Sequence, residues 1–371
     1  MGVFGCGGTP FMPARLITLT GAPYDMGVQH GRLLKEQIHH LARERYELAL
    51  EHAAENGVEV TREACLRLAR EHLPYHQRYS AAVYEELEGI AAGAQLSLEE
   101  LLIANALTDF RDVLWQRLPA PAGAPGCTAF GVRRGYTAAG VTYLGQTWDM
   151  HASAEPFVYV FQRRPDDGPS WLTVSTAGCL SLIGINEVGI AVGNNNLQPK
   201  DARPGVMYLA LIHEALRQTH FTAACRAITE AHRSSGHNYL LADADGTLVD
   251  IETTAEHADE FQPARPYYVH TNHYLSPRLR PLEVEQDLRS SHHRLARLTD
   301  LFEQAGSISG PEHLQRLLSD REGGPDLGIC REGKGRASRS CAFVVLCPEE
   351  QALWMTAGPP TRSALTRFAL R

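Results

Sequence analysis

The stretch PAGAPGCTAF, residues 121–130, separates two parts of the chain that predict different structures. Before it, apolar residues such as Leu34, Ile38 and Leu41 recur three or four positions apart, which is the period of an amphipathic helix. After it, short β-rich segments broken by Gly, Asp or Pro follow one another, as in antiparallel sheets. A linker would explain the Pro and Gly residues of the stretch. It does not explain why Cys127 stands at the head of an apolar run.

The composition is that of an ordinary folded protein. The 371 residues are 44% hydrophobic and 21% charged, far from the pattern of a disordered chain. The net charge of −8 has no long runs of one sign, which argues against nucleic-acid binding and against attraction to a membrane surface. No apolar stretch approaches the roughly 18 to 20 residues of a membrane span. The 8 cysteines are scattered without a CxxC pair, so we expect a reducing, cytoplasmic location.

The order of the segments predicts layers of helix and sheet rather than a series of βαβ units. We expect helices over 24–56, 61–73 and 75–93, and a further helix opened by the capping box SLEE, residues 97–100. Strands are expected within 127–132, 140–150, 157–162, 171–177 and 189–196. Helices return at 205–232, 290–306 and 311–320, and hairpins are expected at 238–253, around an Asp-Gly turn, and at 341–358.

Cys127 stands where the helical part ends, directly after a Pro-Gly turn. Because Gly126 has no Cβ, another group can approach the Gly126–Cys127 peptide closely. This geometry suits attack by the Cys127 thiol on its own preceding carbonyl. If the bond breaks, Cys127 gains an α-amino group with an ordinary pKa of roughly 7.7–8.0, which can act as a base toward the adjacent thiol. Nucleophile and base would then belong to one residue, with no histidine partner.

Three other interpretations stay open on these residues alone. The stretch can be a domain linker that ends in a buried cysteine. The chain can be a conventional cysteine protease with a Cys/His pair, although its 17 histidines show no recognisable signature. It can also be a non-catalytic domain that binds a ligand. An intact polypeptide that depends on one histidine would indicate the protease, and an inert Cys127 would indicate the binding domain.

Five motifs, in this order and spacing, resemble a known family. They are GAPYDMGVQHGRLL (21–34), GCT (126–128), GQTWDMH (145–151), GINEVGIAVGNNN (184–196) and HTNHY (270–274). Together they resemble the acyl-coenzyme A:6-aminopenicillanic acid acyltransferase family of autoproteolytic N-terminal-nucleophile enzymes, relatives of the bile salt hydrolases and penicillin V acylases. The resemblance implies an α+β fold, a four-layer αββα sandwich with a helical N-terminal segment. It also implies self-cleavage into an α chain, residues 1–126, and a β chain, residues 127–371.

The same resemblance implies roles for individual residues. Cys127 matches the family's nucleophile, exposed by cleavage after Gly126. Asp149 matches the acidic residue beside the α-amino group of the nucleophile, although capping of a strand end would also explain an Asp there. Asn272 matches an asparagine whose amide can donate a hydrogen bond to the developing oxyanion, and it can otherwise be a turn residue.

A late Ser/Arg pair also belongs to the family pattern, where the guanidinium helps to order the active site. RSSHHRLARL supplies Ser290, Ser291 and Arg294 in that region, and we assign Arg294 to the catalytic site. Arg289 competes for the assignment, and either arginine can be an exposed helix residue.

The substrate-binding candidates adjoin these positions. Thr128 follows the nucleophile, Trp148 precedes the acidic residue, and Asn194 and Asn195 belong to the GNNN motif, where strand-end turns explain asparagines almost as well.

No cofactor or metal is expected. His270 and His273 flank Asn272 at a spacing that lacks a third ligand, so we interpret them as structural. GICREGKG, residues 328–335, nearly matches a phosphate-binding loop, but Gly335 replaces the required Ser or Thr, and we interpret the segment as a basic surface loop. The expected partner is a small acylated substrate, with acyl-CoA or an amine acceptor as candidates. Self-cleavage would make the protein an α/β heterodimer, and a higher oligomer is left open.

Overall fold

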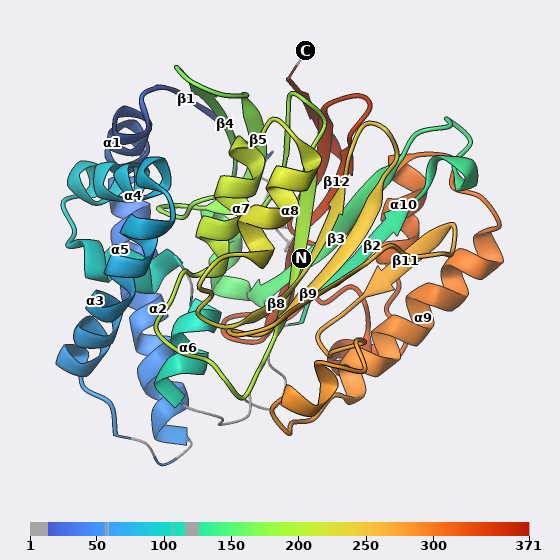
Figure 1. Ribbon diagram of the computed structural model, residues 1–371. Helices are drawn as coiled ribbons and strands as arrows, with labels where there is room; N and C mark the ends of the chain where they lie inside the picture. The colour runs from blue at the N-terminus through green and yellow to red at the C-terminus, as the bar shows by residue number, and fades with distance from the viewer. Residues whose placement is uncertain (1–13, 56, 58, 106, 116–125, 371) are drawn as a thin grey trace, which may run out of the picture.

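The computed structural model describes residues 14–55, 57, 59–105, 107–115 and 126–370 (Figure 1). The prolines and glycines of 121–125 lie outside this part of the chain. Its N-terminal part contains α1 (Pro23–Leu33), α2 (Lys35–Glu55), α3 (Arg62–Tyr79), α4 (Ala81–Ala94), α5 (Leu98–Asn105) and α6 (Leu107–Trp115). The later helices are α7 (Tyr208–Arg217), α8 (Phe221–Thr229), α9 (Arg289–Ala305), α10 (Pro311–Leu318) and the single turn α11 (Gly324–Leu327). Among these described helices, none combines the length and the apolar character needed to cross a membrane.

The strands of the described residues form two sheets. The first sheet has the order β1-β4-β5-β6-β7-β8-β9-β10, and the second has the order β11-β2-β3-β12-β13-β14. Neighbouring strands are antiparallel except for β1 and β4, which are parallel. The first sheet contains β1 (Leu16–Gly21), β4 (Val158–Pro165), β5 (Trp171–Thr176), β6 (Ile183–Asn186), β7 (Ala191–Leu197), β8 (Gly236–Ala242), β9 (Leu248–Thr253) and β10 (Ala258–Phe261). The second contains β2 (Thr128–Val132), β3 (Tyr143–His151), β11 (Tyr267–His270), β12 (Ser338–Cys347), β13 (Ala352–Ala357) and β14 (Thr366–Ala369).

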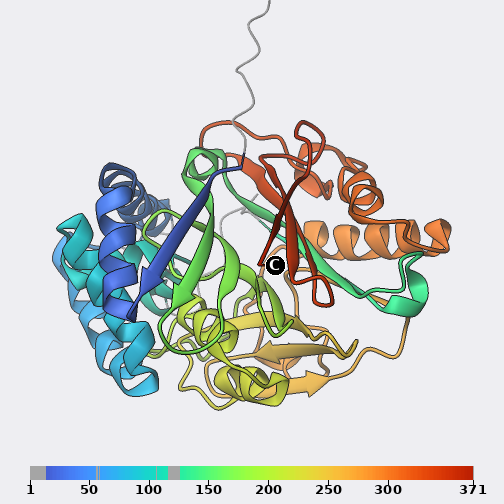
Figure 2. The same cartoon turned by 90° about the horizontal axis from the view of Figure 1, so that it is seen from above.

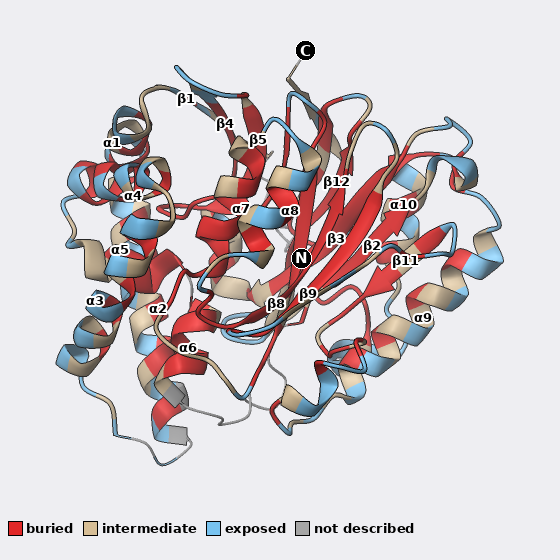
Figure 3. Ribbon diagram, viewed as in Figure 1, coloured by how far each residue is buried: buried red, intermediate tan, exposed pale blue. Residues whose placement is uncertain are grey.

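The two sheets pack face to face, and helices cover their outer faces. β2 and β3 contact β7 and β8 across the interface between the sheets, and these central strands are almost entirely buried (Figure 3), whereas the edge strands β1, β10 and β14 are partly exposed. On the second sheet, Leu298 and Phe302 of α9 pack against Phe130 and Phe343. α7 lies against β6 and β7 of the first sheet, and α1–α6 stand on the side of the molecule opposite α9 (Figure 2). The predicted αββα sandwich with a helical N-terminal segment is therefore confirmed.

Several local predictions are confirmed with their physical cause. In the capping box, Ser97 Oγ accepts a hydrogen bond from Glu100 N at 3.2 Å, and Glu100 Oε2 accepts one from Ser97 N at 3.1 Å. The Asp-Gly hairpin joins β8 to β9, and Gly246 has a φ of 89°, a left-handed value that favours glycine at this turn. The closing hairpin is β12–β13.

The N-terminal part differs from the predicted elements in two places. No strand is predicted before the first helix, but Leu16–Gly21 forms β1, because it pairs with a strand more than 140 residues later. The break expected near residue 74 lies at Ser80, which caps α4 by accepting a hydrogen bond from Val83 N. Pro74 sits inside α3, where His72 and His76 hold the helix through buried hydrogen bonds to distant backbone groups.

The GAPYDMGVQHGRLL motif forms the closest helix contact of the N-terminal part. Gly27 and Gly31 on α1 face Gly89 and Gly93 on α4. A Cβ atom on Gly31 would lie 2.3 Å from the carbonyl oxygen of Ile90, far inside van der Waals contact. The motif therefore serves helix packing, because only glycine lets the two backbones approach so closely.

Buried polar side chains join the N-terminal helices to the rest of the chain. Glu86 on α4 contacts Arg163 Nε of β4 at 2.7 Å and His213 Nε2 of α7 at 3.0 Å, and all three side chains are fully buried. Against the effect of burial, Arg163 and His213 lower the pKa of Glu86. His76 Nε2 accepts a hydrogen bond from Met207 N at 3.2 Å. These contacts cross the predicted cleavage point in the sequence.

Candidate active site

Cys127 lies at the start of β2, a strand paired on both sides by β11 and β3. Its thiol points to the backbone oxygen of Asp149, with 4.0 Å between Sγ and that oxygen. The preceding Gly126 is buried in a tight space, since a Cβ atom there would lie 2.6 Å from Arg294 Nη2 and 2.7 Å from Asn272 Oδ1. The peptide bond predicted to break thus lies beside polar side chains from other elements, and a side chain at residue 126 would have to displace the ends of Arg294 and Asn272.

Arg294 enters this site from α9 and binds the residues around the peptide bond. Its guanidinium donates hydrogen bonds to the carbonyl oxygen of Cys127, to Thr128 Oγ1 at 2.8 Å and to Asn272 Oδ1 at 2.8 Å. The side chain is 1% exposed. Arg289, the competing arginine, pairs with Asp287 on the surface and is 85% exposed. The geometry therefore places Arg294, and not Arg289, next to Cys127.

Asp149 is held from the neighbouring strand β12 and from the segment before it. Its Oδ1 accepts a hydrogen bond from Ser340 Oγ at 2.7 Å. Its Oδ2 lies 3.8 Å from Arg331 Nε, too far for a hydrogen bond but close enough for an ion pair. Burial raises the pKa of the Asp149 carboxyl, and Arg331 and Ser340 oppose that rise. Ser290 accepts hydrogen bonds from both Arg331 and Arg294, so it links the two guanidinium groups.

The charges around the thiol are one carboxylate and two guanidinium groups. Burial and the Asp149 charge raise the pKa of Cys127 to about 12, while Arg294 and Arg331 lower it. In the uncut chain the thiol is therefore protonated at neutral pH. Burial and the nearby Arg331 lower the pKa of Arg294 to about 9, which still leaves it cationic. The site has an excess of positive charge, and such a site favours a developing oxyanion.

Asn272 follows β11, and its amide is held from two sides. Its Oδ1 accepts from Arg294, and its Nδ2 donates to the carbonyl oxygen of Asn196 at 3.0 Å. An amide nitrogen carries two hydrogens, so one remains for another acceptor. Its hydrogen bond with Arg294 thus holds the Asn272 side chain beside the Gly126–Cys127 peptide bond.

The four substrate-binding candidates have different surroundings. The Thr128 hydroxyl accepts from Arg294 and is fully buried. The Asn194 side chain donates to the Leu182 carbonyl oxygen at 2.7 Å. The side-chain amide of Gln146 donates to the Asn194 carbonyl oxygen and accepts from the Asn194 N–H, which ties β7 to β3 across the sheets. Asn195 lies beside Asn238, and Trp148 is 4% exposed. The hydrogen bonds of Thr128 and Asn194 serve the fold in this state, and the substrate role of all four residues stays a prediction.

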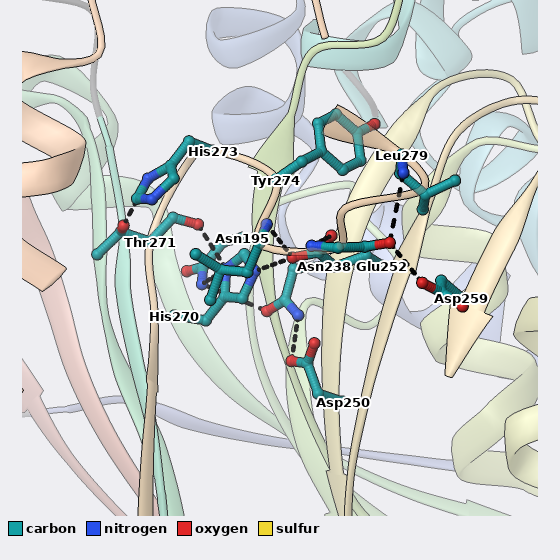
Figure 4. A network of polar contacts seen from close by, with 12 residues as sticks. Asn195, Asn238, Asp250, Glu252, Asp259, His270, Thr271, His273, Tyr274 and Leu279 are labelled. Atoms are coloured by element: carbon teal, nitrogen blue, oxygen red, sulfur yellow. Dashed lines mark hydrogen bonds and ion pairs between the residues drawn. The ribbon is translucent and has the colours of Figure 1, made fainter. Parts of the chain in front are cut away.

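Asp250, Glu252 and His270 offer metal-ligand atoms within 4.8 Å of one another in the described part of the chain. His270 Nε2 already lies 2.8 Å from Glu252 Oε1 in a direct hydrogen bond (Figure 4). An ion bound by both side chains would have to replace that bond. Glu252 and His270 are accounted for by hydrogen bonds to each other and to the backbone, while Asp250 accepts from the Asn238 side chain.

The chain is similar in sequence to a known protein family. A family model described as acyl-coenzyme A:6-aminopenicillanic acid acyl-transferase matches residues 137–362, more than half of the chain. The chain belongs to this acyltransferase family. The family resemblance found in the sequence motifs is confirmed.

Individual relatives are distant. The chain is 25% identical over 330 residues to the acyl-coenzyme A:6-aminopenicillanic-acid-acyltransferase 40 kDa form of Emericella nidulans, with 87% of each protein covered. It is 22% identical over 268 residues to an uncharacterized protein of Archaeoglobus fulgidus, covering 66% of this chain and 44% of that one. Among solved structures it is similar to conjugated bile acid hydrolase from Clostridium perfringens, with a TM-score of 0.46, 12% identity, and 66% and 92% of the two chains covered. It is also similar to penicillin V acylase from Agrobacterium tumefaciens, with a TM-score of 0.40, 11% identity, and coverage of 66% and 86%.

Sequence reasoning about this family member missed Arg331 and Ser340. The segment 328–335 was interpreted as a basic surface loop, and this is wrong for Arg331, which is 2% exposed and paired with Asp149. Lys334 in the same segment is exposed, as expected. No local motif marks Arg331, because its place beside Asp149 depends on the pairing of β12 with the strand that carries Asp149.

Proposed function

We propose that the protein is an autoproteolytically activated, N-terminal-cysteine amide hydrolase or N-acyltransferase that acts on a small acylated amine. One observation carries the proposal: Arg294, Asn272 and the Asp149 backbone surround Gly126 and Cys127, and a Cβ on residue 126 would lie within 3 Å of Arg294 and Asn272 side-chain atoms. That arrangement is what attack on the bond, and later on a substrate carbonyl, would require.

In the proposed self-cleavage, the Cys127 sulfur adds to the carbonyl carbon of Gly126. The carbon–nitrogen bond then breaks, and the nitrogen takes up the thiol proton, leaving a thioester. Water hydrolyses the thioester, which returns the thiol and leaves a carboxylate on Gly126. The products are the α chain, residues 1–126, and the β chain, residues 127–371, which together form the heterodimer.

In the mature protein, the freed α-amino group of Cys127 would take the proton from its own thiol. Asp149 Oδ2, which accepts no hydrogen bond from Arg331 at 3.8 Å, is positioned to hold the new amine. The thiolate would attack an amide or thioester carbonyl, and the remaining amide hydrogen of Asn272 would stabilise the oxyanion. The leaving group would take the proton from the amine, and water or a second amine would then release the acyl group from Cys127.

The substrate class follows from the family. Membership supports a small acyl substrate, and the name of the Emericella nidulans relative supports acyl-CoA and an amine as candidates. The same Cys127 thioester serves both outcomes, since water gives hydrolysis and an amine gives transfer. A cytoplasmic location stays part of the proposal.

The decisive experiment is an intact-mass measurement on purified protein, with a denaturing gel. We expect two fragments that meet between Gly126 and Cys127, and a single uncut chain for Cys127→Ala. The fragments should then be incubated with a panel of N-acylated amines and thioesters, and the β chain should gain the mass of one acyl group.

The rival interpretations predict other results. A conventional cysteine protease would be active as one uncut chain and would lose activity on substitution of a single histidine. A non-catalytic binding domain would show no acyl adduct on Cys127 with any member of the panel. An uncut wild-type chain that remains fully active would contradict the proposal.

A further inference from the structure

Asn272 lies in a short connection after β11, and a single buried carboxylate holds both ends of that connection. Glu252 on β9 binds His270 before Asn272, through Oε1 and Nε2 at 2.8 Å. The same carboxylate accepts from the backbone N–H groups of Leu275 at 2.7 Å and Ser276 at 2.9 Å, after Asn272. Glu252 is fully buried. Any change in its position or charge therefore acts on the segment that carries Asn272.

The hydrogen-bond partners of Glu252 and His270 indicate the charge of each side chain. Both oxygens of Glu252 accept backbone N–H groups, as an ionised carboxylate does. His270 Nε2 faces Glu252. Its Nδ1 lies 2.8 Å from the carbonyl oxygen of Thr271, which can only accept, and this contact is much shorter than the 3.5 Å between Nδ1 and Asn195 Nδ2. Both ring nitrogens of His270 therefore donate, and the ring is an imidazolium. Although burial alone would lower it, Asp250 and Glu252 raise the pKa of His270, in agreement with this assignment.

Neighbouring groups leave this ion pair intact. Asp250, on the same strand as Glu252, accepts from Asn238. Burial raises the pKa of Asp250 to about 7, against the effect of His270. Glu252 is the carboxylate that contacts His270 directly, and the pair joins β9 of the first sheet to β11 of the second.

A second attachment holds Asn272 from the opposite side. Ser291 on α9 accepts from the backbone N–H of Asn272 at 2.8 Å, and it contacts Thr271 Oγ1 and His273 Nδ1 at 2.9 and 2.7 Å. The Asn272 backbone is thus held between α9 and β9, one turn of α9 away from the arginine that binds its side chain.

We propose that the Glu252–His270 ion pair is a positioning device for catalysis, which sets the Asn272 amide relative to Cys127. The role rests on the proposed function, because it matters only if Asn272 stabilises an oxyanion. Glu252 and His270 contact no reacting atom in this assignment. They act through the backbone of residues 271–274.

A double-mutant cycle tests the role. Steady-state rates on one N-acylated amine should be measured for Glu252→Gln, Asn272→Ala and the double variant, each normalised to the β chain that can be acylated. Loss of an oxyanion donor lowers kcat by about 10²- to 10³-fold, and a misplacement of about 1 Å costs about 10²-fold. We expect Glu252→Gln to lower kcat about 10- to 100-fold with KM nearly unchanged, and to have no further effect in the Asn272→Ala background.

Two further variants distinguish an effect on the position of Asn272 from a general loss of folding. Ser291→Ala removes the opposite attachment and should show the same non-additivity with Asn272→Ala. Glu86→Gln breaks another fully buried carboxylate–imidazole contact, far from Asn272 in the fold, and should leave kcat per acylated β chain unchanged.

The outcomes separate the two proposals. Losses that add between Glu252→Gln and Asn272→Ala, or a Glu252→Gln enzyme as fast as wild type, would overturn the positioning role alone. A wild-type chain that is neither cut nor acylated would remove the proposed function, and the positioning role with it.

Discussion

At the scale of single residues, the site depends on how little space surrounds the Gly126–Cys127 bond. Arg294 donates to the carbonyl oxygen of Cys127, and its guanidinium and the Asn272 amide lie close to where a Cβ of residue 126 would be. A side chain at residue 126 would have to push apart two groups that hydrogen bond to each other at 2.8 Å. The first prediction follows from this contact.

Gly126→Ala should slow self-cleavage markedly, because the added methyl group separates Arg294 from Asn272 while leaving the thiol in place. The cut fraction should be followed over days on a denaturing gel. Gly135→Ala is the matched control, since a Cβ there meets no atom within 4 Å, and it should be cut like wild type. Equal cutting rates for the two variants would contradict the crowding argument.

Arg331 provides the second prediction, which concerns pH. Because its charge lowers the pKa of Asp149, its removal should raise that pKa further. If the anionic form of Asp149 holds the α-amino group, the acidic limb of the pH profile of kcat/KM should move to higher pH in Arg331→Gln. Lys334→Gln removes a cation from the same segment in solvent and should leave the limb in place. An unshifted limb in Arg331→Gln would exclude this role for Asp149.

The sequence alone predicts some residues of the site and not others. Cys127, Asp149, Asn272 and Arg294 could be named from motifs, and the structure brings them together, while their catalytic roles stay predictions. Arg331 could not be named, because its importance comes from strand pairing between β3 and β12, which no local pattern records.

At the scale of elements, the glycines of α1 and α4 oppose ordinary helix propensity. Glycine in a helix is less favourable than alanine by about 1 kcal/mol. Here the loss is offset by backbone contact between the two helices, which buries Gly27, Gly31, Gly89 and Gly93. The periodicity of apolar residues predicts both helices but not this contact, because a glycine leaves no apolar side chain to count.

Gly31→Ala should therefore destabilise the protein, although propensity alone predicts the reverse. Overpacking of a tight contact typically costs about 1–3 kcal/mol, and the 2.3 Å approach to the Ile90 oxygen places this site at the upper end of that range. Urea unfolding measures the change. Leu33→Ala, at an exposed position of the same helix, should be close to neutral. A stabilised Gly31→Ala protein would show that the two helices can separate at little cost.

Local sequence patterns do not record contacts with distant residues, which also explains why strand β1 is not predicted and why the helix break is predicted near Pro74 instead of at Ser80. A six-residue edge strand with mixed burial has no strong pattern, and its partner β4 is distant in sequence. Pro74 suggests a helix end locally, but buried hydrogen bonds of His72 and His76 to residues 205 and 207 keep α3 continuous. Tertiary contacts decide both cases.

At the scale of the whole molecule, histidines on the N-terminal helices join the part of the chain before Cys127 to the part after it. His30 Nε2 accepts from Gly178 N at 2.9 Å, and His76 Nε2 accepts from Met207 N. An acceptor nitrogen must be unprotonated, so acid breaks these bonds. Burial lowers the pKa of His30 to about 3 and that of His76 to about 4.

The stability of the protein should therefore carry a contribution from His76 that is lost in acid. The unfolded chain binds a proton at His76 near pH 6.5 and the folded chain only near pH 4, so the contribution is present above pH 6.5 and falls as the pH drops through this window. Its size is on the order of 3 kcal/mol. Asp250 and Glu283, with pKa values raised to about 7, act in the opposite direction.

Denaturant unfolding between pH 4 and 7.5 tests this contribution. His76→Gln should flatten the acid loss relative to wild type, whereas the exposed His257→Gln should follow the wild-type curve. Parallel curves for wild type and His76→Gln would show that the contact does not sense acid.

The strand β1 has a consequence for how the mature protein is made. Residues 16–21 supply the parallel edge of a sheet whose other strands all follow Cys127. Once the backbone is cut at Gly126, that edge strand belongs to a separate polypeptide, although it was assembled as part of one. Refolding then becomes a meeting of two molecules and depends on their concentration. The two chains are thus assembled while they are still joined, and they lose this advantage after the cut. A denatured mature enzyme should recover its activity poorly on dilution. The uncut Cys127→Ala chain should refold equally well at any dilution.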